Sequence, residues 1–119
     1  MKPPAPPAFP SAVTICGKRY SVTYTQELGE TDVDKRYGLW GQMDAHTRSI
    51  RVYVGKADRQ RQPADVLETL LHEMIHAILT DSKLLTACLK DGMEENFVDT
   101  LGVQLADTLT RNNLVRMAP

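Results

Sequence analysis

The residues best suited to chemistry lie in one short run, His72-Glu73-Met74-Ile75-His76, which has the pattern HExxH. Residues four apart on a helix lie one turn above each other, so both imidazoles can reach a single ion at the roughly 2.0–2.1 Å that Zn–N bonds require. Glu73 projects about 60° from His76, beside an open position of the ion, where it can accept a proton from bound water. We therefore expect zinc held by His72 and His76, with Glu73 as the general base. Two alternatives stay open: histidines with ordinary hydrogen bonds, or a metal site without catalysis.

A third protein ligand has to come from elsewhere, because catalytic zinc sites usually have three and no further histidine follows the motif at metzincin spacing. Glu94 and Glu95 open a later amphipathic segment. Asp91 and Glu94 have the spacing of a capping box, which gives Glu94 a structural role. We expect Glu95 as the third ligand and keep Glu94 as the alternative. Asp99 follows Glu95 by one helical turn, so it either orients a ligand histidine or remains an exposed carboxylate.

Two amphipathic helices are predicted to carry these side chains. The first begins near Gln62, with Pro63 suited to its first turn, and its apolar stripe consists of Leu67, Leu70, Leu71, Met74, Ile75 and Ile78. The second opens at Asp91 and runs to about Leu109, with a core face of Phe97, Val98, Leu101, Leu105 and Leu109. The histidines lie at the edge of the first stripe, so a polar ridge borders the core.

Before these helices, the sequence predicts strands. Residues 13–16 and 19–25 are rich in Val, Ile, Thr and Tyr around a Gly17-Lys18 turn, and residues 39–44 and 49–54 flank a second turn at 45–48. The charged segment 27–36 between the pairs is expected to be a loop. The predicted fold class is therefore α+β, with two hairpins forming a small, mostly antiparallel sheet packed on the HExxH helix and a C-terminal helix.

Length and composition favour one ordinary globular domain. We assign residues 12–119 to it and residues 1–11, which contain five prolines, to an N-terminal arm that is either a poorly ordered tail or a docking segment. A net charge of -1 predicts no dedicated nucleic-acid or membrane site. Without a signal peptide or an apolar run of about 18 residues, we expect a cytoplasmic protein. Cys16 and Cys88 are expected to be buried, reduced thiols.

The run 69–78, followed by Glu94-Glu95-Asn96-Phe97-Val98 and a helix, resembles the minimal zincins related to SprT-like and phage-borne metallopeptidases. It is similar, more distantly, to the thermolysin-like gluzincins, in which HExxH is followed by ExxxD, and Glu95 and Asp99 match that second motif in spacing. The resemblance covers roughly residues 38–110. Families of this kind place a short sheet against the active helix.

The resemblance implies amide-bond hydrolysis of a protein or peptide substrate, with Zn²⁺ as the cofactor and Glu73 transferring the proton to the leaving amine. It also implies that an extended peptide is added to an edge strand, which we place at 49–54. The candidates for stabilising the oxyanion are Tyr37, His46, Arg51 and Tyr53. Two other functions remain open: a non-catalytic binding or regulatory module with this fold, and a regulator that cleaves a single repressor-like partner.

Overall fold

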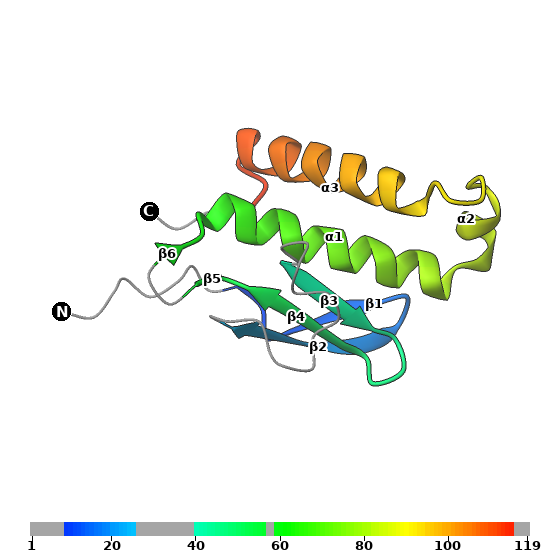
Figure 1. Cartoon of the computed structure of the whole chain (residues 1–119), viewed down its shortest axis with the longest axis horizontal. Coiled ribbons are helices and arrows are strands. Elements are labelled where there is room, and N and C mark those ends of the chain that lie inside the picture. The colour runs from blue at the N-terminus through cyan, green and yellow to red at the C-terminus, as the bar shows by residue number, and fades with distance from the viewer. Residues whose placement is uncertain (1–8, 26–39, 57–58, 116–119) are drawn as a thin grey trace.

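The computed structural model describes residues 9–25, 40–56 and 59–115 of the chain. In order, these residues form β1 (Ala12–Ile15), β2 (Lys18–Thr25), β3 (Gly41–Asp44), β4 (Ser49–Tyr53), β5 (Gly55–Lys56), β6 (Arg59–Gln60), α1 (Pro63–Asp81), α2 (Lys83–Ala87) and α3 (Glu94–Arg111). The sheet covers one side of α1, and α3 lies along the other side (Figure 1). The predicted α+β fold class, with a small and mostly antiparallel sheet, is confirmed.

The first hairpin forms as predicted, but its turn lies one residue earlier. Ile15 pairs with Lys18, so the two loop residues are Cys16 and Gly17 rather than Gly17 and Lys18. Both have positive φ angles, 51° and 79°, as a type I′ turn requires. The twist of this turn matches that of the flanking strands, which fixes the register of β1 against β2.

The second hairpin joins β3 to β4 through residues 45–48, as predicted, with Asp44 opposite Ser49. The Asp44 carboxylate accepts hydrogen bonds from the backbone N–H groups of His46 and Thr47, at 2.9 and 3.2 Å. These bonds close the turn locally.

The strand order is β1-β2-β4-β3, and β2 and β4 run parallel to each other. The prediction that residues 49–54 form an edge strand is therefore wrong. β4 is paired on both sides, and the edge of the sheet beside it is β3. A parallel pairing between segments from two different hairpins is a long-range contact, which a local sequence pattern does not specify.

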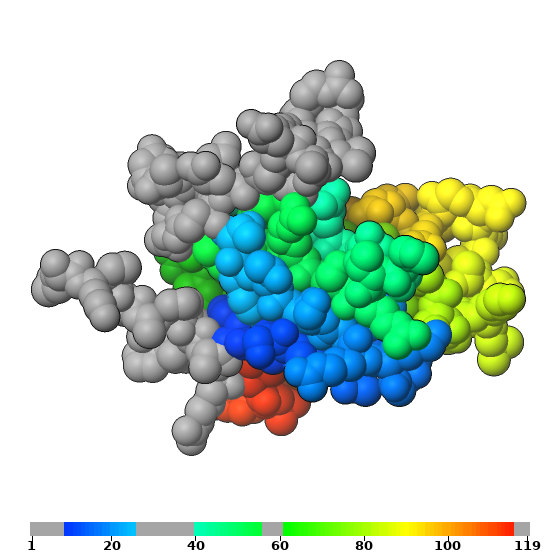
Figure 2. Space-filling model, turned by 90° about the horizontal axis from the view of Figure 1, so that it is seen from below, coloured from blue at the N-terminus to red at the C-terminus, as the bar shows by residue number. Residues whose placement is uncertain are grey.

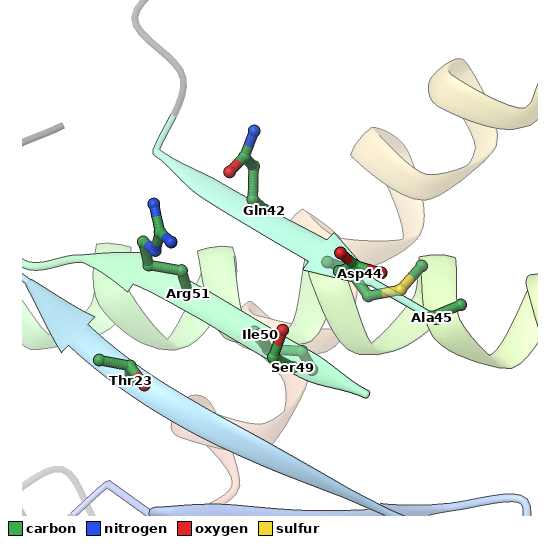
Figure 3. A pocket seen from close by; sticks show the side chains of 8 residues that line it. Thr23, Gln42, Asp44, Ala45, Ser49, Ile50 and Arg51 are labelled. Carbon is green, nitrogen blue, oxygen red and sulfur yellow. The ribbon is translucent and has the colours of Figure 1, made fainter. Parts of the chain in front are cut away.

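The two faces of this sheet differ in polarity. Ile50 and Val52 of β4 are buried against α1, whereas Arg51, between them, projects from the opposite face. There it lies across from Thr23 on β2 and Gln42 on β3, in an open hollow of about 710 Å³ (Figure 3). Figure 2 shows the molecule viewed onto the outer face of the sheet. The strands cover much of the helical layer, and the segment around α2 extends past them.

Helix α1 is buried on two faces, which is more than the single stripe that was predicted. Its first residue is Pro63, as expected. One face joins the sheet in a core that includes Val66, Leu70 and Ala77, and the other contributes Ile75 and Leu79 to a second cluster with Val98 of α3. A helix between two layers requires apolar residues around most of its circumference.

The short segment before α3 contains α2, a helix that the sequence did not predict. Ser82 caps it by accepting a hydrogen bond from the N–H of Leu85. In α3, Val98 is fully buried, but Phe97 is 40% exposed and does not belong to the core face. Phe97 lies about 100° around the helix from Val98, so only one of them can point directly at α1.

The two cysteines are both at the surface of the molecule. Cys16 and Cys88 are free thiols, as predicted, but both are exposed, because Cys16 lies in the tip of a hairpin and Cys88 follows the exposed α2. Most of the proline arm, residue 39 and the predicted loop 27–36 lie outside the described residues. Among the helices that the structure describes, none is long and apolar enough to cross a bilayer.

Candidate metal centre

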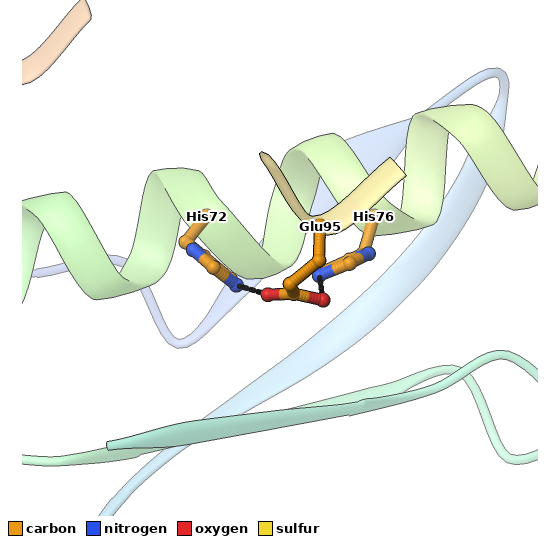
Figure 4. Close-up of side chains that lie close together, drawn as sticks. All are labelled: His72, His76 and Glu95. Atoms are coloured by element: carbon orange, nitrogen blue, oxygen red, sulfur yellow. Dashed lines mark ion pairs between the residues drawn. The ribbon is translucent and has the colours of Figure 1, made fainter. Parts of the chain in front are cut away.

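His72 and His76 project from the same side of α1 toward the start of α3. Their ring centroids are 4.9 Å apart. Glu95 enters from α3 and lies between them, with Oε1 3.0 Å from His72 Nε2 and Oε2 3.2 Å from His76 Nε2 (Figure 4). One ligand atom from each of these three residues lies within 4.8 Å of the others. The predicted ligands His72, His76 and Glu95 are thus brought together, and they could hold a metal ion.

Packing between α1 and α3 sets this geometry. Val98, one turn after Glu94, is fully buried with Ile75 and Leu79. Gly102 lies over the backbone of His72, and a β-carbon at Gly102 would be 3.7 Å from His72 Cα. A residue this small lets the two helix axes approach closely at the level of the first histidine. The distances between the candidate ligands therefore depend on the spacing of these two helices.

The outer nitrogen of each histidine faces a second carboxylate. Asp99 Oδ1 lies 3.2 Å from His72 Nδ1, in the orienting position that was one of its two predicted roles. His76 Nδ1 and Glu94 Oε2 form a hydrogen bond of 2.9 Å. An ionised carboxylate offers only acceptor atoms. With Glu95 bound to an ion, Asp99 and Glu94 would accept the Nδ1 protons and leave each Nε2 able to bind that ion.

The predicted capping box is wrong. Helix α3 begins at Glu94, its N-cap is Met93, and no side chain caps its amides. Glu94 is therefore the first helical residue rather than the third, and its carboxylate contacts His76 instead. The sequence spacing from Asp91 matched the motif, but the Glu94 carboxylate makes its contact with His76 of α1 and not with the amides of its own helix.

Glu73 lies on α1 between the histidines in sequence and is only 7% exposed. It is adjacent to Gly41 on the edge strand, where a β-carbon would be 3.1 Å from Glu73 Cγ and 2.7 Å from Thr69 Cγ2. Burial raises the pKa of Glu73 from 4.5 to about 7, the His76 charge opposes this, and Glu95 adds to it. A carboxylate of this pKa is well matched to accepting and returning a proton near neutral pH.

The charges around His76 have the opposite effect from its burial. Burial by itself lowers the pKa of the imidazole, but the hydrogen bond that the ring makes to Glu94 and the charges of the nearby Glu95 and Glu73 raise this pKa above 6.5 overall. Together with Asp99, these carboxylates give the site more acidic than basic groups. A divalent cation would offset that excess.

The donor set fits a transition-metal ion. Two imidazole nitrogens and one carboxylate oxygen are a known set of ligands for catalytic zinc. A tetrahedral ion with bonds of 2.0–2.1 Å holds neighbouring ligand atoms about 3.3 Å apart. Glu95 Oε1 lies 3.0 Å from His72 Nε2, Glu95 Oε2 lies 3.2 Å from His76 Nε2, and one ligand atom from each of the three residues lies within 4.8 Å of the others.

Of the four candidates for stabilising an oxyanion, three lie within the described residues. Arg51 lies between Ile50 and Val52 in the strand, so it projects from the sheet face away from α1 and Glu73. Tyr53 is buried and only 1% exposed. His46 is exposed in the turn between β3 and β4. These positions do not favour any of the three. Tyr37 lies outside the described residues.

Two residues at the site were missed or misassigned from the sequence. Gly41 was read only as part of a strand, although a glycine inside a strand often marks a close approach of another element. The orienting contact of Glu94 had no local signal, because its partner His76 is 18 residues away on another helix.

Comparison with known proteins found no matching family model, no matching curated protein and no matching solved structure.

Proposed function

We propose that this protein is a zinc-dependent metallopeptidase. The observation that carries the proposal is the convergence of His72, His76 and Glu95 within 4.8 Å. The buried Glu73 lies on the same helix as the two histidines. The first three residues supply the ligands, and Glu73 supplies a base whose pKa is raised to about 7. This division between ligands and base is the one that an HExxH helix requires.

A bound zinc ion would polarise the scissile carbonyl and lower the pKa of a coordinated water from 15.7 to about 7. Glu73 would take the proton from that water and pass it to the leaving amine. Its burial keeps bulk water from competing for the proton, and its contact with Gly41 limits the positions that the side chain can occupy. The resemblance of the sequence to the minimal zincins and gluzincins supports the same assignment.

The proposed binding site for the peptide is the outer edge of β3. Residues 41–44 pair with β4 on one side only within the described sheet, so their other side can add an extended peptide by β-strand addition. Gly41, the first residue of this strand, contacts Glu73 and Thr69 of α1. A peptide bound along β3 would therefore pass close to the general base.

The test is peptide hydrolysis by purified protein with one equivalent of zinc, using a denatured protein and a mixed peptide library as substrates. We expect cleavage that a chelator abolishes and zinc restores. Glu73→Gln should lose at least about 10²-fold in activity while still binding zinc. Glu68→Gln makes the same chemical change five residues earlier on the same helix, and it should remain active.

The outcomes also separate the proposed enzyme from its alternatives. Zinc binding without cleavage of any substrate, together with partner binding that Glu73→Gln leaves unchanged, would support a non-catalytic module. Cleavage of one cellular protein without cleavage of the library would support a dedicated regulator. Wild-type protein that binds no zinc would contradict all of these functions.

A further inference from the structure

We propose that Glu94 is a positioning residue, which holds the His76 ring so that Nε2 carries a lone pair and faces the metal ion. The inference rests on the metal centre of the proposed function. It gives Glu94 a role distinct from ligand and from helix cap, the two roles that its sequence position suggests.

The contacts of His76 carry the argument. Its Nδ1 lies 2.9 Å from Glu94 Oε2, and its Nε2 lies 3.2 Å from Glu95 Oε2. Two successive residues of α3 thus contact the two opposite nitrogens of one imidazole. Both carboxylates can only accept, so the role of Glu95 as a metal ligand distinguishes them. With Glu95 bound to the ion, the neutral ring donates its proton from Nδ1 to Glu94 and leaves Nε2 free to coordinate.

The position of Glu94 at the start of α3 holds its carboxylate beside His76. Glu94 is the first residue of α3, where the positive end of the helix dipole favours a carboxylate. It is also partly buried against α1, and no side chain caps the helix there. The orientation of His76 is therefore fixed from α3, the same helix that supplies Glu95.

The second histidine provides an internal comparison. His72 Nδ1 lies 3.2 Å from Asp99 Oδ1, so each imidazole has its own outer carboxylate. Removing Glu94 should disturb His76, and removing Asp99 should disturb His72. A general loss of structure would disturb both rings alike.

The experiment compares wild type with Glu94→Ala, Glu94→Gln, Asp99→Ala and Asp91→Ala. Asp91→Ala removes the same charge three residues before Glu94 and serves as the matched control. Zinc affinity is measured by competition with a chromophoric chelator, and the ring nitrogens of each histidine are observed by long-range ¹H–¹⁵N NMR in the zinc-loaded protein. Neither measurement depends on peptidase activity.

We expect Glu94→Ala to weaken zinc binding by about 10–100-fold, the usual effect of removing a carboxylate that hydrogen-bonds a ligand histidine. The ring signals of His76 should change and those of His72 should not, with the reverse for Asp99→Ala. Glu94→Gln should retain much of the affinity and the Nδ1–H signal, because its amide oxygen still accepts a hydrogen bond. Asp91→Ala should match wild type.

Several results would overturn the inference. Wild-type affinity and wild-type His76 signals in Glu94→Ala would show that the contact does not orient the ring. Equal changes at both histidines would indicate a structural effect, and the isosteric Glu94→Gln tests the same point if the alanine variant does not fold. Loss of zinc in Glu94→Gln but not in Glu95→Gln would make Glu94 a ligand. Zinc binding that depends on Glu94 in a protein without peptidase activity would support this inference while contradicting the proposed function, and a protein that binds no zinc would contradict both.

Discussion

Gly41 lies directly against Glu73, at a separation where a β-carbon on Gly41 would stand 3.1 Å from Glu73 Cγ. The edge strand and the proposed general base are therefore in contact through a residue without a side chain. The same β-carbon would stand 2.7 Å from Cγ2 of Thr69, whose hydroxyl accepts a hydrogen bond of 2.8 Å from Arg61. Thr69 is buried and its hydroxyl is held by Arg61, so it cannot readily move away.

Gly41→Ala should therefore destabilise the fold by about 1–3 kcal/mol, the usual cost of overpacking a well-packed site, and reduce peptide hydrolysis. The measurements are urea unfolding and the rate of peptide cleavage. Thr69→Ser removes the clashing Cγ2 and keeps the hydroxyl, so the double variant should recover part of the stability that Gly41→Ala loses. Strictly additive effects of the two substitutions would contradict the close contact.

The buried Glu73 predicts a specific pH dependence for the metal-free protein. Its pKa is about 7 in the folded state and 4.5 when exposed, so folding favours the protonated form. The stabilisation is complete below pH 4.5 and is lost as the pH rises to about 7, by roughly 3 kcal/mol if the whole difference in pKa is realised. Glu73→Gln stays neutral, so its free energy of unfolding should rise relative to wild type over this range, as measured by urea unfolding in the presence of chelator. A difference that does not change with pH would show that Glu73 is not desolvated.

Metal binding should stabilise the protein through residues on two different helices. Zinc in 1,000-fold excess over Kd should add about 4 kcal/mol to the free energy of unfolding. Elemental analysis should find about one zinc in wild type, and His72→Ala should lose it. Glu95→Gln should weaken zinc binding by more than the 10–100-fold that is typical when a hydrogen-bond partner of a ligand histidine is removed. The choice of ligand would be wrong if Glu95→Gln binds zinc as tightly as wild type and Glu94→Gln does not.

The parts of the site that the sequence predicted are those fixed by short-range spacing. His72 and His76 are one helical turn apart, and Glu95 and Asp99 repeat that spacing on α3, so each pair lies on one face of its helix. The hairpins also followed from local turn chemistry and alternation. These features depend on neighbours along the chain, which a single sequence displays.

The remaining features depend on contacts between distant segments. The parallel pairing of β2 with β4 makes β3 the edge strand, and no residue pattern within either strand encodes that partner. The exposure of Phe97 follows from how α3 docks on α1, with Val98 turned toward Ile75 and Leu79. The close approach of Gly41 to Glu73 and Thr69 likewise appears only when α1 is packed against the sheet.

The close packing of α3 on α1 leads to a last prediction, at Gly102. A β-carbon there would meet the backbone and β-carbon of His72 at 3.7–3.8 Å, which is ordinary van der Waals contact. Gly102→Ala should therefore fit, and it should stabilise the protein by up to about 1 kcal/mol because alanine favours a helix interior over glycine. Gly102→Leu has no room for its longer side chain and should push α3 away from α1. Because Glu95 lies on α3 and the histidines lie on α1, this separation should weaken zinc binding along with stability. The measurements are thermal unfolding and chelator competition, and equal zinc affinity in the alanine and leucine variants would show that helix spacing does not control the site.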